Sequence, residues 1–334
     1  MTATIRIPAL SVAIAIAVAA AAGIATATPA IADTRLLIGM GDSYTTGGGV
    51  PGGDDESSGA DPCTQSLGSY PLVAADELGF DGQNVACGGA VLADFTTTSR
   101  RGAPPQTASI AGADIVTFTM GGNDVGGPRG VLESSRTPAT MADFAAAVDA
   151  LGPQLVSAYL DVRRAAPAAE IYVLGYPDIV PATQQALDAC LGASAAGLAA
   201  ADIHHNVTLL NQTIAAAAAE VGSVFVATTP SFAGHEMCTE QPYANASDER
   251  APASPGGALH PNELGHLAMA AALISALGGL EEPGTPGPTD PPAGMPAPPA
   301  PGLTPQERAA VRAIAQALLG RLLEDLTRQR GIGR

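Results

Sequence analysis

The stretch Leu36-Leu37-Ile38-Gly39-Met40-Gly41-Asp42-Ser43 carries the most information about the fold of this chain. Its apolar first half is typical of a strand buried on both faces of a parallel sheet. The Gly-Asp-Ser triplet that follows places a hydroxyl group directly behind the strand. Open parallel sheets bind ligands outside the carboxyl ends of their strands. Ser43 is therefore the first candidate for a functional residue.

Similar strand patterns recur along the chain, at Gln83–Cys87, Asp114–Thr119, Glu170–Leu174 and Ser223–Thr228. Helical patterns separate them, at Tyr70–Leu78, Thr140–Ala165, Ala195–Glu220 and Asn262–Leu277. Thr140–Asp143 resembles a capping box, and Pro167 lies just beyond the end of that helix. Buried strands alternating with helices predict an α/β fold: a three-layer α/β/α sandwich around a five-stranded, mostly parallel sheet.

The composition excludes some classes of partner. The chain has 334 residues and a formal net charge of -17, which disfavours binding to nucleic acid. Aromatic residues make up only 4 % of the chain, and tryptophan is absent, which argues mildly against a polysaccharide-binding cleft. We therefore expect a small-molecule or lipid ester as substrate and no nucleic-acid partner.

The N-terminus has the pattern of an export signal. Arg6 precedes an apolar, alanine-rich run at Ile7–Ile24, and Ala30-Ile31-Ala32 is a small-residue cleavage site. We predict a signal peptide over residues 1–32 and a secreted protein that begins at Asp33. The alternative is an uncleaved membrane anchor, because the apolar run approaches the length of a span.

Four cysteines fit an oxidising compartment, and three pairings of them are possible. Cys63 follows Ser43 in a polar loop and Cys87 ends a predicted strand, so both are expected at one end of the sheet. Cys190 and Cys238 then form the second pair. No Cys-x-x-Cys spacing exists, so we predict no metal site.

The C-terminal part differs from the predicted catalytic domain, residues 33–280. Residues 281–302 are rich in Pro and Gly and are expected to form a linker. Residues 303–334 have the spacing of an amphipathic helix, with six arginines against three acids. This basic tail could dock on its own domain, pair with another protein or lie on an anionic membrane surface.

Two further motifs complement Ser43. Gly121-Gly122-Asn123-Asp124 follows a predicted strand, and His260-Pro261-Asn262 precedes the last predicted helix. A serine nucleophile, an imidazole base and an amide donor for an oxyanion are what acyl transfer requires. Each residue alone has a plain structural alternative: a helix cap for the serine, a turn for the asparagine and a solvated loop position for the histidine.

Together these motifs resemble the GDSL-type, or SGNH, hydrolase family. The resemblance runs from Leu36 to Leu277, and the four namesake positions correspond to Ser43, Gly89, Asn123 and His260. Gly89 is preferred to Gly88 because Asn84–Ala90 is similar to the glycine block of secreted actinobacterial members.

The resemblance implies a flavodoxin-like sandwich without a metal or organic cofactor. It implies Ser43 and His260 as the catalytic residues, and an oxyanion hole made by Ser43, Gly89 and Asn123. It also implies disulfides placed like Cys63–Cys87 and Cys190–Cys238.

One position departs from the family pattern. Many members have an aspartate three residues before the histidine, where this chain has Gly257. We expect a backbone carbonyl around Gly257–Ala258 to orient His260, with Asp248 or Glu249 as the less favoured option. Asp42 and Asp124 are interpreted as loop braces or caps. The remaining histidines are interpreted as solvated or packed: His204, His205, His235 and His266.

These observations predict a secreted carboxylesterase or lipase that works through a Ser-His dyad and an acyl-enzyme. A carbohydrate O-acetyl esterase is the main rival within the same chemistry. A catalytically silent exported binding protein is the alternative from another class.

Overall fold

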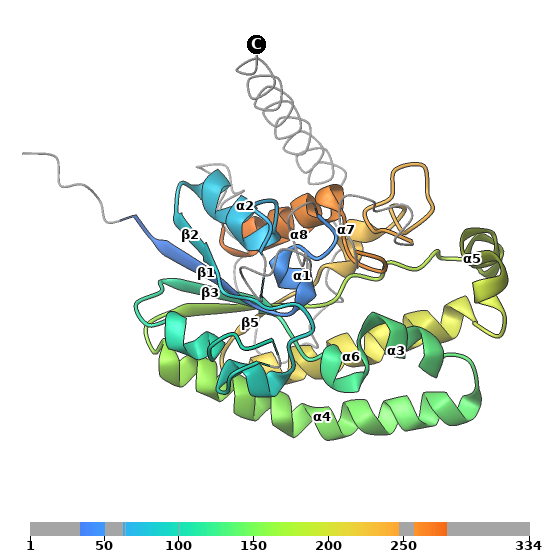
Figure 1. Ribbon diagram of the computed structural model, residues 1–334, viewed down its shortest axis with the longest axis horizontal. Coiled ribbons are helices and arrows are strands. Elements are labelled where there is room, and N and C mark those ends of the chain that lie inside the picture. The colour runs from blue at the N-terminus through green and yellow to red at the C-terminus, as the bar shows by residue number, and fades with distance from the viewer. Residues whose placement is uncertain (1–33, 51–62, 64, 100, 247–256, 279–334) are drawn as a thin grey trace, which may run out of the picture. The chain divides into compact units, whose positions relative to one another are not determined.

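The computed structural model describes most of the region that the motifs span (Figure 1). The described residues are 34–50, 63, 65–99, 101–246 and 257–278. The predicted signal peptide (1–32), the linker (281–302) and the basic tail (303–334) lie outside them and stay predictions. Asp248 and Glu249 also lie outside them.

Five strands form one parallel sheet in the order β2-β1-β3-β4-β5. Their bounds are Leu36–Gly41 (β1), Asp81–Asn84 (β2), Ile115–Thr119 (β3), Glu170–Leu174 (β4) and Val224–Val226 (β5). This is the strand order of flavodoxin-like folds, in which the direction of winding reverses between β1 and β3. All five carboxyl ends therefore meet at one edge, and the reversal opens a crevice beside Ser43.

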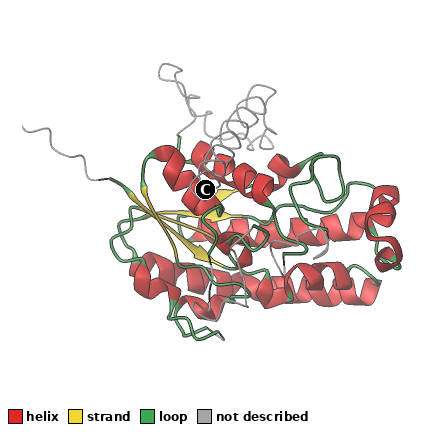
Figure 2. Cartoon of the chain, turned by 45° about the horizontal axis from the view of Figure 1, so that its top comes forward, coloured by secondary structure: helices red, strands yellow, loops and turns green. Residues whose placement is uncertain are grey.

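Helices cover both faces of the sheet, as Figures 1 and 2 show. One layer contains α2 (Tyr70–Leu78), α7 (Thr229–Phe232) and α8 (Glu263–Ala276). The other layer contains α4 (Pro138–Ala165) and α6 (Ala200–Glu220), which pack along each other. The predicted three-layer sandwich is confirmed.

Three shorter helices follow strands at the carboxyl edge. They are α1 (Ser43–Thr46), α3 (Gly127–Ser134) and α5 (Gln184–Leu191). The glycines and proline in α3 conceal its helical periodicity, and no helix was predicted there or at α5. Among the described helices, none alone has the length and apolar composition of a membrane span; only the bent pair Gln184–Ala195 and Ala200–Glu220 together meets that test.

Some predicted boundaries were wrong. Strand β2 runs from Asp81 to Asn84, so Cys87 lies beyond its end rather than within it. This edge strand pairs only with β1 and is largely exposed, so it lacks the apolar run by which the buried strands were predicted. The capping box of α4 is formed by Thr137 and Thr140, not by Thr140–Asp143, and Pro138 occupies the first turn. Helix α6 begins at Ala200 because the residues before it form a separate short turn.

Candidate active site

Ser43 lies where β1 ends and α1 begins. The N-cap of α1 is Asp42, whose Oδ1 accepts a hydrogen bond from the Tyr44 N–H at 2.9 Å. Ser43 itself is the first helical residue and is only 8 % exposed. Its hydroxyl is therefore not used as a helix cap, whereas Asp42 is the cap that the sequence predicted.

The turn at this strand end requires glycine. Gly41 has a φ of +125°, and a Cβ there would lie 2.4 Å from the Thr119 carbonyl oxygen. The Gln106 side chain forms two hydrogen bonds with the backbone of the same glycine: it accepts from the Gly41 N–H at 2.6 Å and donates to the Gly41 carbonyl at 2.9 Å. The strand end that carries Ser43 is thus held on both sides by neighbouring backbone and side chain.

His260 faces Ser43 although the two are 217 positions apart. Its Nε2 is 2.8 Å from Ser43 Oγ, and its Nδ1 is 2.8 Å from the Ala258 carbonyl oxygen. With Nδ1 protonated, Nε2 has the lone pair needed to accept the serine proton. The carbonyl that contacts Nδ1 belongs to the Gly257–Ala258 segment, in which an orienting carbonyl was expected.

The last residue of the His-Pro-Asn motif anchors the next helix. Asn262 is the N-cap of α8, and its side chain accepts from the Gly265 N–H at 3.1 Å and donates to the Pro242 carbonyl at 2.7 Å. These two bonds attach the histidine loop to α8 and to the segment that precedes it.

Asn123 follows β3 and lies beside the segment that contains Gly89. Its Nδ2 donates to the Ala90 carbonyl at 2.9 Å, which uses one of the two amide hydrogens. Gly89 is partly exposed, whereas Gly88 is buried. Asp124 accepts from the Leu92 N–H at 3.2 Å and so braces the same segment, and burial raises the pKa of its carboxyl to about 6.

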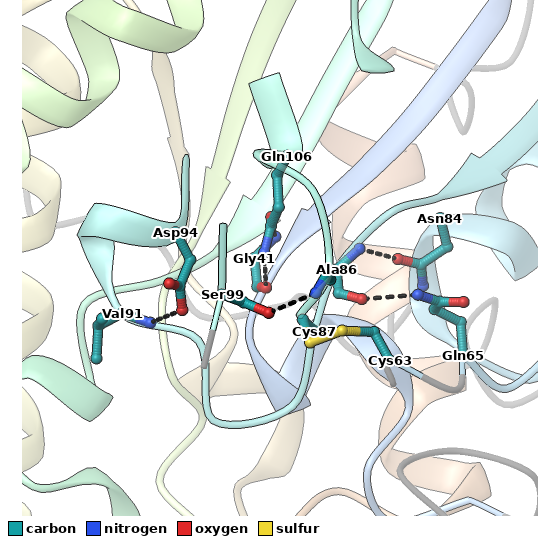
Figure 3. The surroundings of a disulfide bond; sticks show 11 residues. Gly41, Cys63, Gln65, Asn84, Ala86, Cys87, Val91, Asp94, Ser99 and Gln106 are labelled. Carbon is teal, nitrogen blue, oxygen red and sulfur yellow. Dashed lines mark hydrogen bonds between the residues drawn. A yellow bond between two sulfur atoms is a disulfide. The ribbon is translucent and has the colours of Figure 1, made fainter. Parts of the chain in front are cut away.

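A disulfide ties the start of this segment to Cys63 (Figure 3). Cys63 and Cys87 are bonded, and next to them Gln65 donates to the Ala86 carbonyl at 2.8 Å. The second disulfide joins Cys190 in α5 to Cys238. Both pairings agree with the sequence prediction.

The other histidines lie outside the Ser43–His260 contact. His204 pairs with Asp178, a partner that the sequence analysis missed, and His235 stacks on Tyr243 with ring centroids 4.0 Å apart. His205 is exposed. His266 is fully buried, its Nδ1 accepts from the Tyr70 N–H at 3.3 Å, and burial lowers its pKa to about 3.

An apolar pocket opens beside Ser43 and Asn123. Its walls come from α3, from the loop after β4 and from α6. The apolar side chains that line it include Val131, Leu132, Ile179, Val180, Ile203, Val207, Leu210 and Leu259. The apolar character of this lining suits a hydrocarbon chain better than a sugar ring.

Two buried tyrosines at the site have no motif in the sequence. The Tyr176 hydroxyl donates to Asp42 Oδ2 at 2.5 Å and accepts from the Gly122 N–H at 2.8 Å. Burial and the Asp42 charge raise the pKa of Tyr176 well above its usual value, so it stays a donor. The Tyr44 hydroxyl donates to the Leu259 carbonyl at 2.7 Å. The sequence offered only their positions as a sign of a role at the site: Tyr176 follows the end of β4, and Tyr44 follows the candidate nucleophile.

Comparison with known proteins identifies the family. The GDSL-like Lipase/Acylhydrolase family model matches residues 40–268. Lipase 2 of Streptomyces coelicolor is 33 % identical over 271 residues, which cover 75 % of this chain and 89 % of the lipase.

Two solved structures are also similar. The extracellular lipase of Streptomyces rimosus is 28 % identical, with a TM-score of 0.58 over 73 % of this chain and 100 % of that one. Phospholipase A1 of Streptomyces albidoflavus is 26 % identical, with a TM-score of 0.58 over 72 % of this chain and 99 % of that one. The chain therefore belongs to the GDSL-like lipase/acylhydrolase family of carboxylic-ester hydrolases.

Proposed function

We infer that this protein is a secreted serine esterase or lipase that cleaves acyl esters through a Ser43–His260 dyad. The observation that carries this proposal is the 2.8 Å contact between Ser43 Oγ and His260 Nε2 at the edge of an apolar pocket. A serine hydroxyl is a weak nucleophile until a base within hydrogen-bond distance removes its proton.

In the proposed first step, Ser43 Oγ attacks the ester carbonyl carbon while its proton passes to His260 Nε2. The Ala258 carbonyl stabilises the resulting imidazolium through Nδ1. The second amide hydrogen of Asn123 and the backbone N–H groups of Ser43 and Gly89 stabilise the tetrahedral oxyanion.

Collapse of this intermediate breaks the carbonyl–alkoxy bond, and the imidazolium returns its proton to the departing alcohol. Water then attacks the acyl-enzyme with His260 again as the base, which releases the acid and restores Ser43. The apolar pocket would hold the acyl chain during both steps, and its lining favours an aliphatic ester over a carbohydrate acetate.

Export rests on the predicted signal peptide, on the two disulfides and on the similarity to an extracellular lipase. The test is N-terminal sequencing of the protein recovered from culture medium. A mature chain that starts at Asp33 supports cleavage, and a cell-bound chain with residues 1–32 intact contradicts it.

Hydrolysis of p-nitrophenyl butyrate tests the chemistry. We expect Ser43→Ala to lose about 10⁴-fold or more in kcat, whereas Ser157→Ala on the exposed surface of α4 keeps wild-type turnover. A fluorophosphonate probe should label wild type on Ser43 and leave the variant unlabelled. Equal turnover of Ser43→Ala and wild type would rule out catalysis at this site, and the absence of turnover in both would favour the binding-protein alternative.

A second set of variants separates a dyad from a triad. The double change Asp248→Asn with Glu249→Gln should leave kcat nearly unchanged, because the Ala258 carbonyl already accepts from Nδ1. A loss of several orders of magnitude would mean that an acid orients the base.

A further inference from the structure

The residue before the candidate base has an unusual backbone conformation. Leu259 has a φ of +61°, and within the described ranges only Cys238 shares a positive φ among residues other than glycine. L-residues with a branched side chain rarely adopt this left-handed conformation, because Cβ approaches the backbone carbonyl oxygen. Some other interaction must therefore hold Leu259 in place.

The φ angle of Leu259 decides where the Ala258 carbonyl points. Rotation about N–Cα of Leu259 turns the peptide plane that contains the Ala258 oxygen relative to His260. Relaxation to an ordinary value near −60° would rotate that plane by about 120°. The 2.8 Å contact with His260 Nδ1 would then be lost.

Tyr44 holds the carbonyl group of Leu259. Its hydroxyl donates to the Leu259 carbonyl at 2.7 Å, and its ring lies 5.2 Å from the His260 ring. The backbone of Asn245 also holds this segment: its carbonyl accepts from the Leu259 N–H at 2.8 Å, and its N–H donates to the His260 carbonyl at 3.0 Å. Both backbone polar groups of Leu259, its N–H and its C=O, are therefore held by hydrogen bonds.

Tyr44 is itself rigidly placed. It is 4 % exposed, and it makes an edge-to-face contact with Tyr176 at 5.1 Å between ring centroids. Tyr176 is fixed by its bonds to Asp42 and to the Gly122 N–H. Burial raises the pKa of the Tyr44 hydroxyl far above its usual value, so the hydroxyl remains a donor at any pH used to assay an esterase.

We propose that Tyr44 is the positioning residue for His260, in place of the acid absent at Gly257. By holding the Leu259 carbonyl, it keeps Leu259 left-handed and so keeps the Ala258 carbonyl directed at Nδ1. The residue next to the nucleophile thus orients the base. This inference rests on the proposed Ser43–His260 dyad.

The test is a double-mutant cycle with Tyr44→Phe and Leu259→Gly. Tyr44→Phe removes one hydroxyl group, and glycine adopts φ near +60° without steric cost. We expect Tyr44→Phe to lower kcat on p-nitrophenyl acetate, and the rate of fluorophosphonate labelling, by about five- to twentyfold. KM should change by less than about twofold, since a positioning defect affects the transition state rather than ground-state binding.

In the Leu259→Gly background the same Tyr44→Phe change should cost less than about twofold, because no strain is left for the hydroxyl to oppose. Tyr172→Phe is the matched control: its hydroxyl bonds to Glu170 at 2.9 Å near the start of β4, and its loss should leave kcat unchanged. Thermal unfolding of all variants checks that each is folded.

Two results would overturn the inference. One is a folded Tyr44→Phe variant with wild-type kcat and labelling rate; the other is an equal loss from Tyr44→Phe in the wild-type and Leu259→Gly backgrounds. Ser43→Ala keeps the two proposals separate. If Ser43→Ala is inactive while Tyr44→Phe is fully active, the dyad stands and only the positioning role fails.

Discussion

The apolar pocket beside Ser43 gives the most discriminating prediction about substrate choice. Val207 lies on α6, is partly exposed and lines the pocket beside Ser43. Val207→Phe would fill space that an acyl chain otherwise occupies. We expect this variant to lose its preference for longer acyl chains while it still hydrolyses acetate.

The size of the chain-length preference can be estimated from the burial of methylene groups against the apolar lining. Each methylene that is fully buried contributes about 0.8 kcal/mol, or about a fourfold rise in kcat/KM. The methylenes that distinguish hexanoate from acetate therefore raise kcat/KM by up to about 200-fold, and by about 15-fold if they are half buried. Val207→Phe should reduce the hexanoate-to-acetate ratio by at least about tenfold.

The assay is kcat/KM across p-nitrophenyl esters from acetate to octanoate. Val224→Phe on β5 is the control, because it makes the same change at a side chain that is 47 % exposed and outside the pocket lining. An unchanged chain-length profile in a folded Val207→Phe protein would show that acyl chains bind elsewhere and would refute this reasoning.

Three further predictions concern stability and the site's backbone. The pKa of His266 is about 3 in the folded state and about 6.5 when unfolded, so the unfolded state takes up a proton as pH falls below about 6.5. The wild type should therefore lose about 2 kcal/mol of folding stability between pH 7 and pH 5 that His266→Asn does not lose, as measured by urea unfolding at both pH values. Cys190→Ser combined with Cys238→Ser opens a loop of 48 residues and should lower the free energy of unfolding by up to about 4 kcal/mol. Reducing agent should destabilise the wild type more than this variant, in which only the Cys63–Cys87 disulfide is left to reduce. Gly41→Ala places Cβ 2.4 Å from a β3 carbonyl oxygen, so calorimetry should show a loss above about 2 kcal/mol, and esterase activity should fall with it; wild-type stability would contradict the strained-turn argument.

The strands in the middle of the sheet were predictable because each is buried on both faces. Such strands read as continuous apolar runs, and the predicted Glu170–Leu174 is the observed β4. The edge strand β2 was misplaced because its exposed residues carry no apolar run. The start of α4 was misplaced because two threonines three residues apart offered alternative caps, and Pro138 selects the earlier one.

The candidate catalytic residues could be named from the sequence, since each follows a recognisable strand end or precedes a helix. The side chains that position them could not. The hydroxyl groups of Tyr44 and Tyr176 contact the Leu259 carbonyl and Asp42, which are remote from them in the chain, and no local pattern records those contacts.

The amino-acid sequence by itself determined the alternation of five strands with the longer helices and the three motifs that carry the candidate chemistry, because hydrophobic periodicity and turn residues are local properties. Tertiary structure alone decided that Ser43 Oγ meets His260 Nε2, that the Ala258 carbonyl faces Nδ1 and that α3 and α6 enclose an apolar pocket. The physical reason is that these contacts depend on the direction of side chains and peptide planes across distant segments, which only the packed sheet and its helices establish.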